Sequence, residues 1–576
     1  MLSIILMVPK RLSFMKNKID KTLSGSNFWL FIVIFISLLP LTPLLHSGIF
    51  AGHDTPDHVA RIANFYQNLS EGTLIPRWAG NLNWGYGHPI LMFLYPLPSY
   101  VASFFMMLGL SVVAATKIVF AIGFVGSGIT IFLWVRKMLG DKAGFIAATF
   151  YLFAPYRFVD LYVRGAIGEN FFFVFPPLIC YFLIKLRETK HITYIPLTAI
   201  AIAGMVLSHN ALAIMFLPFV ALYGAILIFQ EKNRVRTAIY MVSSAILGFG
   251  LSAFFLIPAF LEGKYTLRDI VTKNEIFNRF ETFSRLLYSS WDYGGSGHMS
   301  VQVGIGHWLA VLVSTIGVVV YLLNKKAAKK LSPMPVEHVY VLTSSLVFFL
   351  LSIFLMLPVS KPIYVAITIL QKFQFPWRFL SLSVFTSSIL AGFAVSVLFP
   401  KKHNIVIMIG LIALLISIPF WQPKGFIEKE LSFYTNVYPG TTDTGESAPV
   451  WSVRFMEKEP DTHAEIVEGL GSIQPGSRTS TKHIYTVESS SEKVRIRENT
   501  LYFPGWKVFV DNKEIPISGI FFQDPNYRGL INFFIDSPGT HEVVVAFTET
   551  KLRFLSNLIS AVSVIVVVVL LVYVKK

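Results

Sequence analysis

The chain has 576 residues, of which 54% are hydrophobic and only 14% are charged, and its formal net charge is +16. Apolar runs of about twenty residues recur along it, which is typical of a polytopic helical membrane protein because each run can cross the hydrocarbon core. The lysines and arginines lie mostly in short loops between these runs. They therefore indicate membrane topology and exclude nucleic acid as a partner. A single cysteine, Cys180, excludes an internal disulfide and a cysteine metal site.

The apolar runs predict membrane spans in chain order. We expect them at 27–48, 111–134, 143–158, 170–186, 192–208, 210–229, 236–260, 304–323, 337–357, 377–398, 404–421 and 556–574. The basic stretch MVPKRLSFMKNKIDK precedes the first run and no small-residue cleavage site follows it, so we interpret the first helix as retained, with a cytoplasmic N-terminus.

The run 89–110 is the exception among the apolar runs. With the N-terminus inside, the basic loops at 136–142, 185–191, 230–236, 324–330 and 401–404 all fall inside only if this run does not change sides. It contains YPLPSY, whose two prolines break a straight helix. We therefore predict a re-entrant or interfacial segment. The alternative is an ordinary span with one basic loop on the wrong side.

The predicted membrane crossings divide the chain into three parts. Residues 1–421 are predicted to form a membrane domain of about 12–13 helices, with outer loops at 49–88, 159–169 and 261–303. Residues 422–555 contain alternating stretches such as WKVFVDNKEIPI and HEVVVAF, separated by turn signals such as DPNYRG and SPGTH, and predict a small outer β-sandwich. Residues 556–576 then form a C-terminal transmembrane anchor.

The first outer loop carries the densest polar cluster, in FAGHDTPDHVARIANF. Asp54, Asp57, His58 and Arg61 are spaced so that they share one face of a helix. Helix capping, with Thr55 as N-cap and Asp57 in the first turn, accounts for part of this pattern but not for Asp54, His58 or Arg61. A carboxylate here can act as a general base toward a hydroxyl group. Asp54 and Asp57 could instead bind a divalent cation such as Mg²⁺ or Mn²⁺.

The second cluster is PYRFVDLYVRGAIGEN, residues 155–170. Arg157, Asp160 and Arg164 share a helical face, and Glu169 opens the next span. Interfacial arginines paired with Asp160 are one interpretation. However, arginines at an outer end oppose the positive-inside bias, and arginine suits bidentate contact with phosphate.

Three weaker clusters lie on the same side of the membrane. In LSHNAL, His209 forms either a polar turn or part of a site. In QFPWRFL, Arg378 is either an interfacial anchor or a phosphate contact. Arg77, in the first outer loop, has the same two interpretations. The loop 261–303 can fold over a substrate as a lid. Its candidate residues are Glu262, Lys264, Asp292 and His298. Phosphate-loop, dinucleotide, zinc-hydrolase and serine-hydrolase motifs are absent from the sequence. Few charged residues fall within the predicted spans, which disfavours a proton-coupled transporter.

The motifs resemble a known group of membrane enzymes. HDTPDHVARI after one span resembles the GT-C superfamily of membrane glycosyltransferases. PRWAGNLNWGYGHPILMFLYPLPSY, YLFAPYRFVDLYVRGAIGENFFFVFPPL and LSHN resemble bacterial membrane proteins labelled 6-pyruvoyl-tetrahydropterin synthase-related. LYFPGWKVFVDNKEIPI and PGTHEVVVAF with the last span are similar to the end of bacterial membrane proteins implicated in glycosylating lipoteichoic acid. The resemblance is best in 50–215 and 500–576.

The resemblance implies transfer of a sugar from a polyprenyl-phosphate donor to a glycan, lipid or protein acceptor on the outer face of the plasma membrane. The catalytic carboxylate of the first loop falls on Asp54, and a further acid falls on Asp160 or Glu169. The sequence has no strict Asp-x-Asp in these loops, which leaves metal dependence open. The expected substrate-binding residues are His58, Arg61, Arg77, Arg164, His209 and Arg378, with Trp84, Tyr86 and Trp291 expected to stack on sugar rings.

The main hypothesis is therefore an inverting GT-C-type glycosyltransferase. One rival is a transporter or flippase of lipid-linked sugars. It would need an inner-face site, but the predicted inner loops are short, have at most one acid each and have no aromatic residue. Another rival is a membrane assembly factor that uses the β-domain as a binding module.

Overall fold

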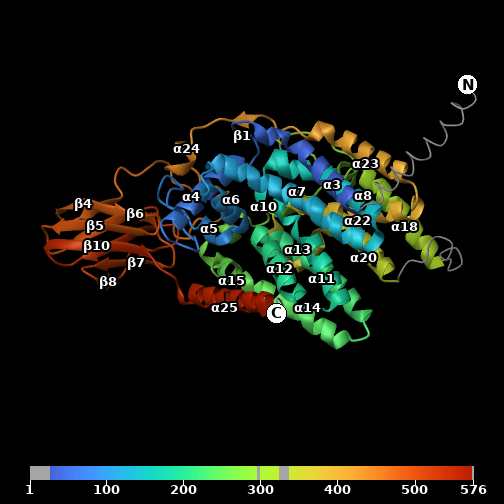
Figure 1. Cartoon of the computed structure of the whole chain (residues 1–576). Helices are drawn as coiled ribbons and strands as arrows, with labels where there is room; N and C mark the ends of the chain where they lie inside the picture. The colour runs from blue at the N-terminus through green and yellow to red at the C-terminus, as the bar shows by residue number, and fades with distance from the viewer. Residues whose placement is uncertain (1–25, 295–298, 324–335, 574–576) are drawn as a thin grey trace, which may run out of the picture.

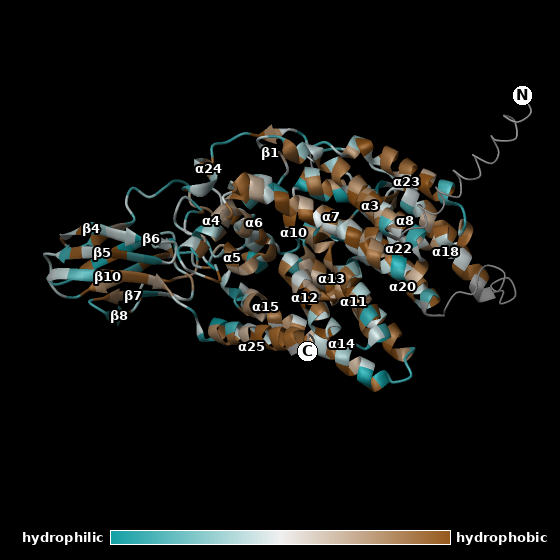
Figure 2. Cartoon of the chain, viewed as in Figure 1, coloured by the Kyte–Doolittle hydropathy of each residue, from teal (hydrophilic) through white to brown (hydrophobic). Residues whose placement is uncertain are grey.

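The structure is a computed structural model that describes residues 26–294, 299–323 and 336–573. A bundle of long helices makes up most of the molecule, and a β-sandwich projects from one end of it (Figure 1). The bundle is predominantly hydrophobic, whereas polar residues are more frequent in the sandwich and in the connecting loops (Figure 2).

The first half of the bundle begins with α3 and ends with α13. Its elements are α3 (Ser26–Leu38), η1 (Leu39–Leu45), β1 (Ile49–Phe50), α4 (Thr55–Ser70), α5 (Ile90–Phe93), α6 (Leu97–Met107), α7 (Val112–Leu139), α8 (Asp141–Phe153), α9 (Pro155–Phe158), the π-helix η2 (Val159–Arg164), α10 (Ile167–Phe172), α11 (Phe175–Thr189), α12 (Tyr194–Ser208) and α13 (Asn210–Phe229).

The second half begins with α14 and includes short elements around the outer loops. Its elements are α14 (Arg234–Leu251), α15 (Ala253–Leu261), η3 (Gly263–Tyr265), α16 (Arg268–Val271), η4 (Glu275–Asn278), α17 (Phe283–Leu287), α18 (Ile305–Leu323), α20 (Val336–Met356), η5 (Pro358–Ser360), α21 (Lys361–Ala366), η6 (Thr368–Phe373), η7 (Pro376–Phe379), α22 (Leu380–Leu398), α23 (His403–Ser417), η8 (Ile418–Phe420), β2 (Phe426–Ile427), α24 (Ser432–Thr435) and, after the sandwich, α25 (Lys551–Tyr573).

Eight helices of the described residues are long and apolar enough to cross a membrane, and a bent pair makes nine. They coincide with predicted spans, from Asn27–Leu45 to Lys551–Val572. The count is below the expected 12–13 because Asp141–Phe153 and Tyr194–Ser208 are short helices, and because α18 (Ile305–Leu323) ends where the described residues end. The predicted class, a helical polytopic membrane protein with a small β-domain near the C-terminus, is confirmed.

Local sequence explains the bounds of the long helix α7. The Ser111 hydroxyl accepts a hydrogen bond from the Ala114 N–H (3.2 Å) and caps the first turn. Gly140, with a φ of 88°, ends the helix, and Arg136 and Lys137 lie in the last turn, where cations stabilise the helix dipole. Helix α7 then packs on α8, and α8 packs on α22, which forms the centre of the bundle.

The predicted span 236–260 is not a straight helix. Helices α14 and α15 meet at an angle of 68°, and Ser252 lies between them. The Ser560 hydroxyl of α25 donates to the Gly250 carbonyl (2.9 Å) and accepts from the Phe254 N–H (2.9 Å). The backbone groups freed by the break therefore have partners within the protein, which is the condition for a broken helix in a membrane.

The run 89–110 is also broken, as its prolines predict. Helices α5 and α6 are separated at Leu94–Pro96, and Pro96 and Pro98 begin the second of them. The prediction that this run stays on one side of the membrane is not tested by these bounds.

The β-sandwich consists of two antiparallel sheets. One has five strands in the order β4-β5-β10-β7-β8, and the other has three in the order β3-β6-β9. The strands are β3 (Ala464–Glu468), β4 (Gly471–Arg478), β5 (Lys482–Ser489), β6 (Val494–Leu501), β7 (Trp506–Val510), β8 (Lys513–Ile515), β9 (Leu530–Ile535) and β10 (Gly539–Phe547). Alternate residues such as Val487, Ile496, Val508, Phe533 and Val543 form the core between the sheets.

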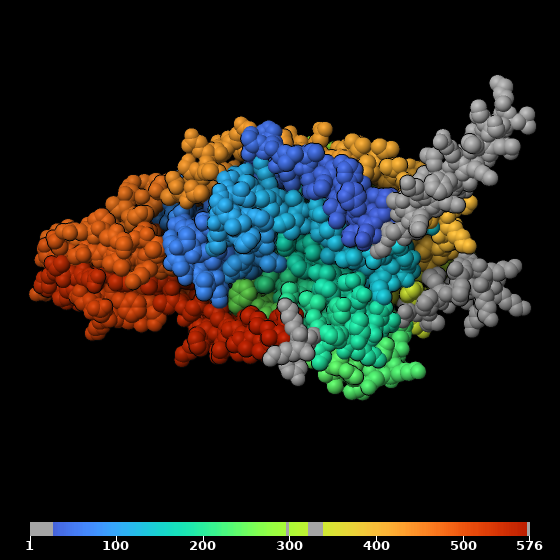
Figure 3. All heavy atoms as spheres, viewed as in Figure 1, coloured from blue at the N-terminus to red at the C-terminus, as the bar shows by residue number. Residues whose placement is uncertain are grey.

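The segment 422–463, expected to begin the β-domain, is a separate feature. Its strand β2 pairs with β1, and Tyr438 N–H donates to the Asn81 carbonyl (2.8 Å), so it runs along the first outer loop. In the space-filling view this segment, in orange, adjoins the N-terminal blue part of the bundle (Figure 3).

Candidate functional site

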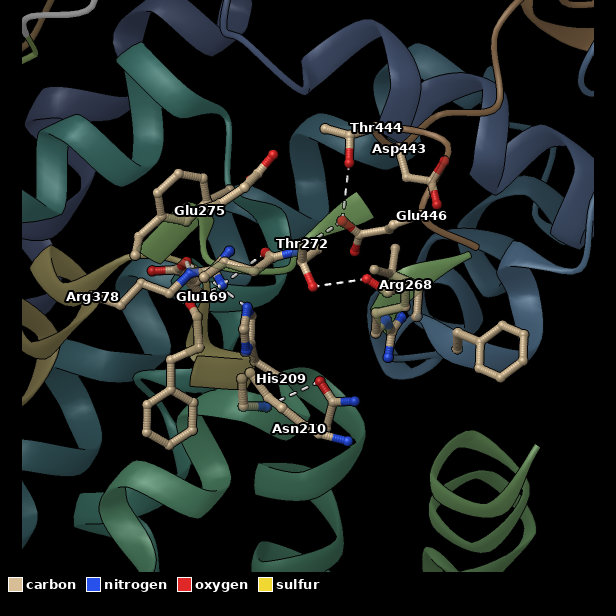
Figure 4. Close-up of a pocket in the computed structure, with 18 of the residues that line it drawn as sticks. Glu169, His209, Asn210, Arg268, Thr272, Glu275, Arg378, Asp443, Thr444 and Glu446 are labelled. Atoms are coloured by element: carbon tan, nitrogen blue, oxygen red, sulfur yellow. Dashed lines mark hydrogen bonds and ion pairs between the residues drawn. The ribbon is translucent and has the colours of Figure 1, made fainter. Parts of the chain in front are cut away.

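Seven separate stretches of the chain meet around one cavity of about 800 Å³. The stretches are the first outer loop with α4, residues 93–95, residues 164–169, the α12–α13 junction, residues 256–294 with Met299, residues 368–378 and residues 442–454. Of the predicted site residues, seven line it: Asp54, His58, Arg61, Arg164, Glu169, His209 and Arg378. Figure 4 shows Glu169, His209 and Arg378 directed toward one another on one wall, with Asp443 and Glu446 across the cavity.

Backbone contacts bring the first and second outer loops together. The His53 N–H donates to the Val163 carbonyl and the Asp54 N–H to the Arg164 carbonyl, both at 2.9 Å. Gly165 ends the π-helix η2 with a φ of 66°, and a Cβ at this position would collide with the Thr55 hydroxyl. A glycine is therefore required both for the turn and for the close approach of the two loops.

The Asp54 side chain is free. It occupies the N-cap position of α4, one residue earlier than the expected Thr55, but makes no side-chain cap hydrogen bond. Its exposed carboxylate lines the cavity and has no hydrogen bond or ion pair to another described residue. Capping therefore does not use this carboxylate, and it can accept a proton from a bound hydroxyl group.

His58 and Arg61 form a pair on the buried face of α4. Arg61 Nη1 donates to His58 Nδ1 (2.8 Å), and Arg61 also donates to the side chain and carbonyl of Thr442. Burial, with Arg61 and Arg164 nearby, lowers the pKa of His58 well below its ordinary value. No carboxylate of the described residues lies within 4 Å of the Arg61 guanidinium, so its charge is available to an anion in the cavity.

Glu169 is the centre of an ion-pair network. Its Oε1 accepts from Arg164 Nη2 (2.8 Å) and Arg378 Nε (3.1 Å), and its Oε2 accepts from the Tyr156 hydroxyl (3.0 Å). His209 Nε2 lies 3.8 Å from the same Oε1. The carboxylate is thus fully engaged, which suits positioning of two guanidinium groups better than the predicted role of a catalytic acid.

Arg164 is held from three directions. Besides Glu169, it contacts Asp160 Oδ1 (2.7 Å), and its guanidinium lies 4.5 Å from the centre of the Trp377 ring. Asp160 is fully buried and does not line the cavity, so its position gives no support to the predicted role of a further catalytic acid. Arg378 donates further to the Phe373 carbonyl (2.8 Å).

His209 caps a helix and also lines the cavity. Its Nδ1 accepts from the Leu212 N–H (3.2 Å) and caps α13, while its ring stacks on Tyr95 with centroids 5.0 Å apart. Because Nδ1 accepts, the proton lies on Nε2, which faces Glu169.

Several predicted binding residues lie elsewhere. Arg77 is buried and pairs with Glu549 (2.9 Å), and it donates to Asn557, so it fastens the first outer loop to α25. Trp84 and Tyr86 pack against the core of the β-sandwich. Trp291 packs on Phe420. The expected sugar-stacking roles of these three aromatic residues therefore do not fit their positions outside the cavity.

Other candidates are also placed outside the cavity. Asp57 accepts from the Tyr438 hydroxyl (2.8 Å), and burial raises its pKa, an effect that this hydrogen bond opposes. Arg157 donates to Ser127 (3.0 Å) inside the bundle. Glu262 pairs with Arg553 of α25 (2.8 Å). Lys264 lies over the Tyr265 ring, and Asp292 accepts from the Gly294 N–H. His298 lies outside the described residues.

A metal site at Asp54 and Asp57 gains no support from the geometry. Within 26–294, 299–323 and 336–573, no group of three or more His, Cys, Asp or Glu side chains is arranged to hold a metal ion. Asp57 also faces Tyr438 rather than the cavity.

Sequence reasoning missed the cations at the cavity mouth and the strip from 442 to 454. Four cavity-lining cations that were not predicted have no carboxylate within 4 Å among the described residues: Arg268, Lys273, Lys372 and Arg454. The basic residues of the 261–303 loop could have indicated the cations that this loop contributes to the cavity. The strip 442–454 has no periodic pattern, and only its acids, Asp443 and Glu446, mark it.

Fold and site together define a polytopic helical membrane protein with a charged cavity at one end of the bundle and a β-sandwich beside it. The model of the 6-pyruvoyl-tetrahydropterin synthase related domain, a membrane protein family, matches residues 91–422. The chain belongs to this family, which confirms the predicted branch.

Other comparisons give more distant relatives. An uncharacterized protein of Lactococcus lactis subsp. cremoris (strain MG1363) is 27% identical over 274 residues, which cover 46% of this chain and 44% of the relative. The chain thus spans less than half of that protein.

Three solved glycosyltransferases have a partly similar arrangement. The mycobacterial arabinofuranosyltransferase AftD shares 14% identity with a TM-score of 0.46, and the match covers 71% of this chain and 29% of that one. ArnT from Cupriavidus metallidurans, bound to undecaprenyl phosphate, shares 12% identity with a TM-score of 0.36, and the match covers 67% of this chain and 63% of that one. The Archaeoglobus fulgidus oligosaccharyltransferase shares 14% identity with a TM-score of 0.42, and the match covers 74% of this chain and 59% of that one. Scores below 0.5 describe a partial likeness and carry no statement about activity.

Proposed function

We propose that this protein is a membrane glycosyltransferase of the GT-C type that transfers a sugar from a polyprenyl-phosphate donor to an acceptor hydroxyl on the outer face of the plasma membrane. The observation that supports it most is the free carboxylate of Asp54 in the same cavity as three arginines, Arg61, Arg164 and Arg378. A base and an anion-binding group are the two parts that such a transfer requires.

The charges of the site suit a phosphate group. Arg164 and Arg378 share the Glu169 carboxylate, Arg164 also pairs with Asp160, and Arg61 has no carboxylate partner in the described structure. Of these three guanidinium groups, that of Arg61 is therefore the one that no carboxylate pairs in the described structure. Since arginine binds phosphate through two parallel hydrogen bonds, Arg61 is our choice for the phosphate contact.

The apolar part of the cavity suits a lipid chain. Ile214 of α13, Leu256 and Phe260 of α15 and Ile369 of η6 line one side, and Phe260 is 71% exposed. These residues belong to or adjoin helices that cross or approach the membrane, so a prenyl chain can lie along them while its phosphate faces the arginines.

The proposed reaction is a single displacement. Asp54 takes the proton of the acceptor hydroxyl as the hydroxyl oxygen bonds to the anomeric carbon. The bond from that carbon to the donor phosphate oxygen breaks, and the phosphate leaves with the electron pair. Arg61, Arg164 and Arg378 stabilise the added negative charge. Attack on the face opposite the leaving group inverts the anomeric configuration.

The test is transfer from a labelled polyprenyl-phosphate sugar by protein reconstituted in liposomes. We expect Asp54→Asn to lose activity by about 10²- to 10⁴-fold, the usual contribution of a general base. Its unfolding temperature should stay unchanged because the side chain has no partner in the described structure. Asp57→Asn, outside the cavity, is the matched control. Full activity of Asp54→Asn would remove the proposed base.

The same liposomes separate transfer from transport. Without acceptor, we expect the labelled donor lipid to stay in its leaflet. Movement of the donor across the bilayer at the rate of product formation would support a flippase instead.

A further inference from the structure

A second hollow lies between α3–η1 and the beginning of α7. It has a volume of about 610 Å³ and shares no lining residue with the cavity of the candidate site. Most of its wall is aliphatic: Leu38, Leu41, Leu44, Leu45, Leu110, Val113, Ala114, Ile118 and Ala121. Leu38 and Leu45 are 51% and 86% exposed, so this groove opens to the outside of the bundle.

One charged side chain, Lys117 of α7, also lines the groove. Its Nζ donates to the His46 and Ser47 carbonyls. An ammonium group has three donors, so one N–H is uncommitted. No carboxylate of the described residues lies within 4 Å of this nitrogen, although Lys117 is only 9% exposed. The nearby acid Glu428 is bonded to the Ser47 hydroxyl (2.8 Å) and does not line the groove.

We propose that this groove binds an anionic phospholipid of the bilayer, with one acyl chain along the leucines and the headgroup phosphate on Lys117. An aliphatic wall ending in a single cation without a counter-ion matches the chemistry of that molecule. Burial of an ammonium without an anion is unfavourable, and a phosphate oxygen accepting the third N–H would offset that cost.

The position of the groove favours a bilayer phospholipid over the proposed donor. A polyprenyl phosphate seated here would keep its phosphate away from Asp54, because the two hollows have no residue in common. The groove is nevertheless connected to the candidate site through the backbone. Lys117 holds the carbonyls of His46 and Ser47, and the chain continues through β1 to His53 and Asp54. Bound lipid would therefore brace the segment that carries the candidate base.

Native mass spectrometry of the full chain tests this inference without any activity measurement. Delipidated protein is titrated with phosphatidylglycerol and, separately, with phosphatidylcholine of the same acyl chains. We expect one phosphatidylglycerol to bind in preference to phosphatidylcholine. Lys117→Gln should weaken that binding about tenfold, as expected for loss of a hydrogen bond to a charged group. Lys117→Arg should keep it.

Two further variants control the experiment. Lys142→Gln removes another lysine that donates to a carbonyl, that of Pro400, but lies outside the groove, and it should bind like the parent. Ala114→Phe fills the groove without changing Lys117 and should lose the lipid. The inference is overturned if Lys117→Gln and Ala114→Phe both retain phosphatidylglycerol as the parent does. Equal binding of phosphatidylcholine by the parent would also overturn it, even if Lys117→Gln failed to fold.

Discussion

Glu169 and Arg378 come from different outer segments, yet Arg378 Nε donates to Glu169 Oε1 at 3.1 Å, the same oxygen that Arg164 contacts at 2.8 Å. One buried carboxylate thus fixes two guanidinium groups at the wall of the cavity. Its second oxygen is occupied by Tyr156, so its position is set by four elements of the fold.

Glu169→Gln should therefore damage both the fold and the site. Removing one partner from a buried ion pair costs about 3–5 kcal/mol, because it leaves uncompensated charge behind. We expect a lower unfolding temperature and a raised KM for the donor, since two arginines lose their common anchor. Glu275→Gln breaks the Arg279 pair at the half-exposed rim and should cost less than about 1 kcal/mol. Equal behaviour of the two variants in thermal unfolding would contradict the anchoring role.

Gly165→Ala should separate backbone strain from loop contact. At a φ of 66° any Cβ is strained, and here it would also meet the Thr55 hydroxyl. Strain of this kind costs about 1–3 kcal/mol. Gly72 has a φ of 90° but nothing within 4 Å of a Cβ, so Gly72→Ala reports strain alone. We expect Gly165→Ala to lose transfer activity well beyond Gly72→Ala, because the clash displaces Asp54. If both lose activity equally, the contact between the loops is not needed.

Local patterns in the sequence predicted some parts of this molecule better than others. The spacing of Asp54, His58 and Arg61 places them on one helix, and these three do line the cavity, because helical periodicity is a local property. The role of Glu169 depends on Arg378, which is far along the chain. An acidic residue at the beginning of a predicted span gives the same sequence pattern whether its carboxylate is free or paired.

Residue type alone misplaced other side chains. Trp84 and Tyr86 carry the aromatic faces that sugars favour, but they bury those faces against the β-sandwich, which lies far from them in sequence. The bend at Ser252 had a visible signal in Gly248, Gly250 and Pro258, whereas the partner that makes it possible, Ser560, is on the last helix. Contacts between distant segments have no signature in a single sequence.

The sidedness of the cavity can be tested by cysteine labelling, because the natural Cys180 is buried. Leu74, in the first outer loop, is 79% exposed, and Val235, in a predicted inner loop, is 71% exposed. We expect Leu74→Cys to react with a membrane-impermeant maleimide on intact cells and Val235→Cys to react only after permeabilisation. The unsubstituted chain is the control. The reverse pattern would put Asp54 on the cytoplasmic side and end the proposal of transfer at the outer face.

His58 predicts how stability depends on pH. Burial, together with Arg61 and Arg164, lowers the pKa of His58 in the folded protein well below its ordinary 6.5. Below pH 6.5 the unfolded chain binds a proton that the folded protein excludes, so the free energy of unfolding falls as the pH falls, by at most about 1.4 kcal/mol per pH unit from this residue. Above pH 6.5 the contribution of His58 is constant.

The measurement is thermal unfolding of detergent-solubilised protein from pH 7.5 to 5. His58→Gln cannot titrate, so the difference in unfolding temperature between the parent and this variant should narrow toward pH 5. His191→Gln, at an exposed position, should follow the parent at every pH. A proton on His58 Nδ1 would replace the hydrogen bond from Arg61 at 2.8 Å with repulsion, which is one reason why the folded protein excludes it. Parallel curves for the parent and His58→Gln would show that His58 does not exclude the proton.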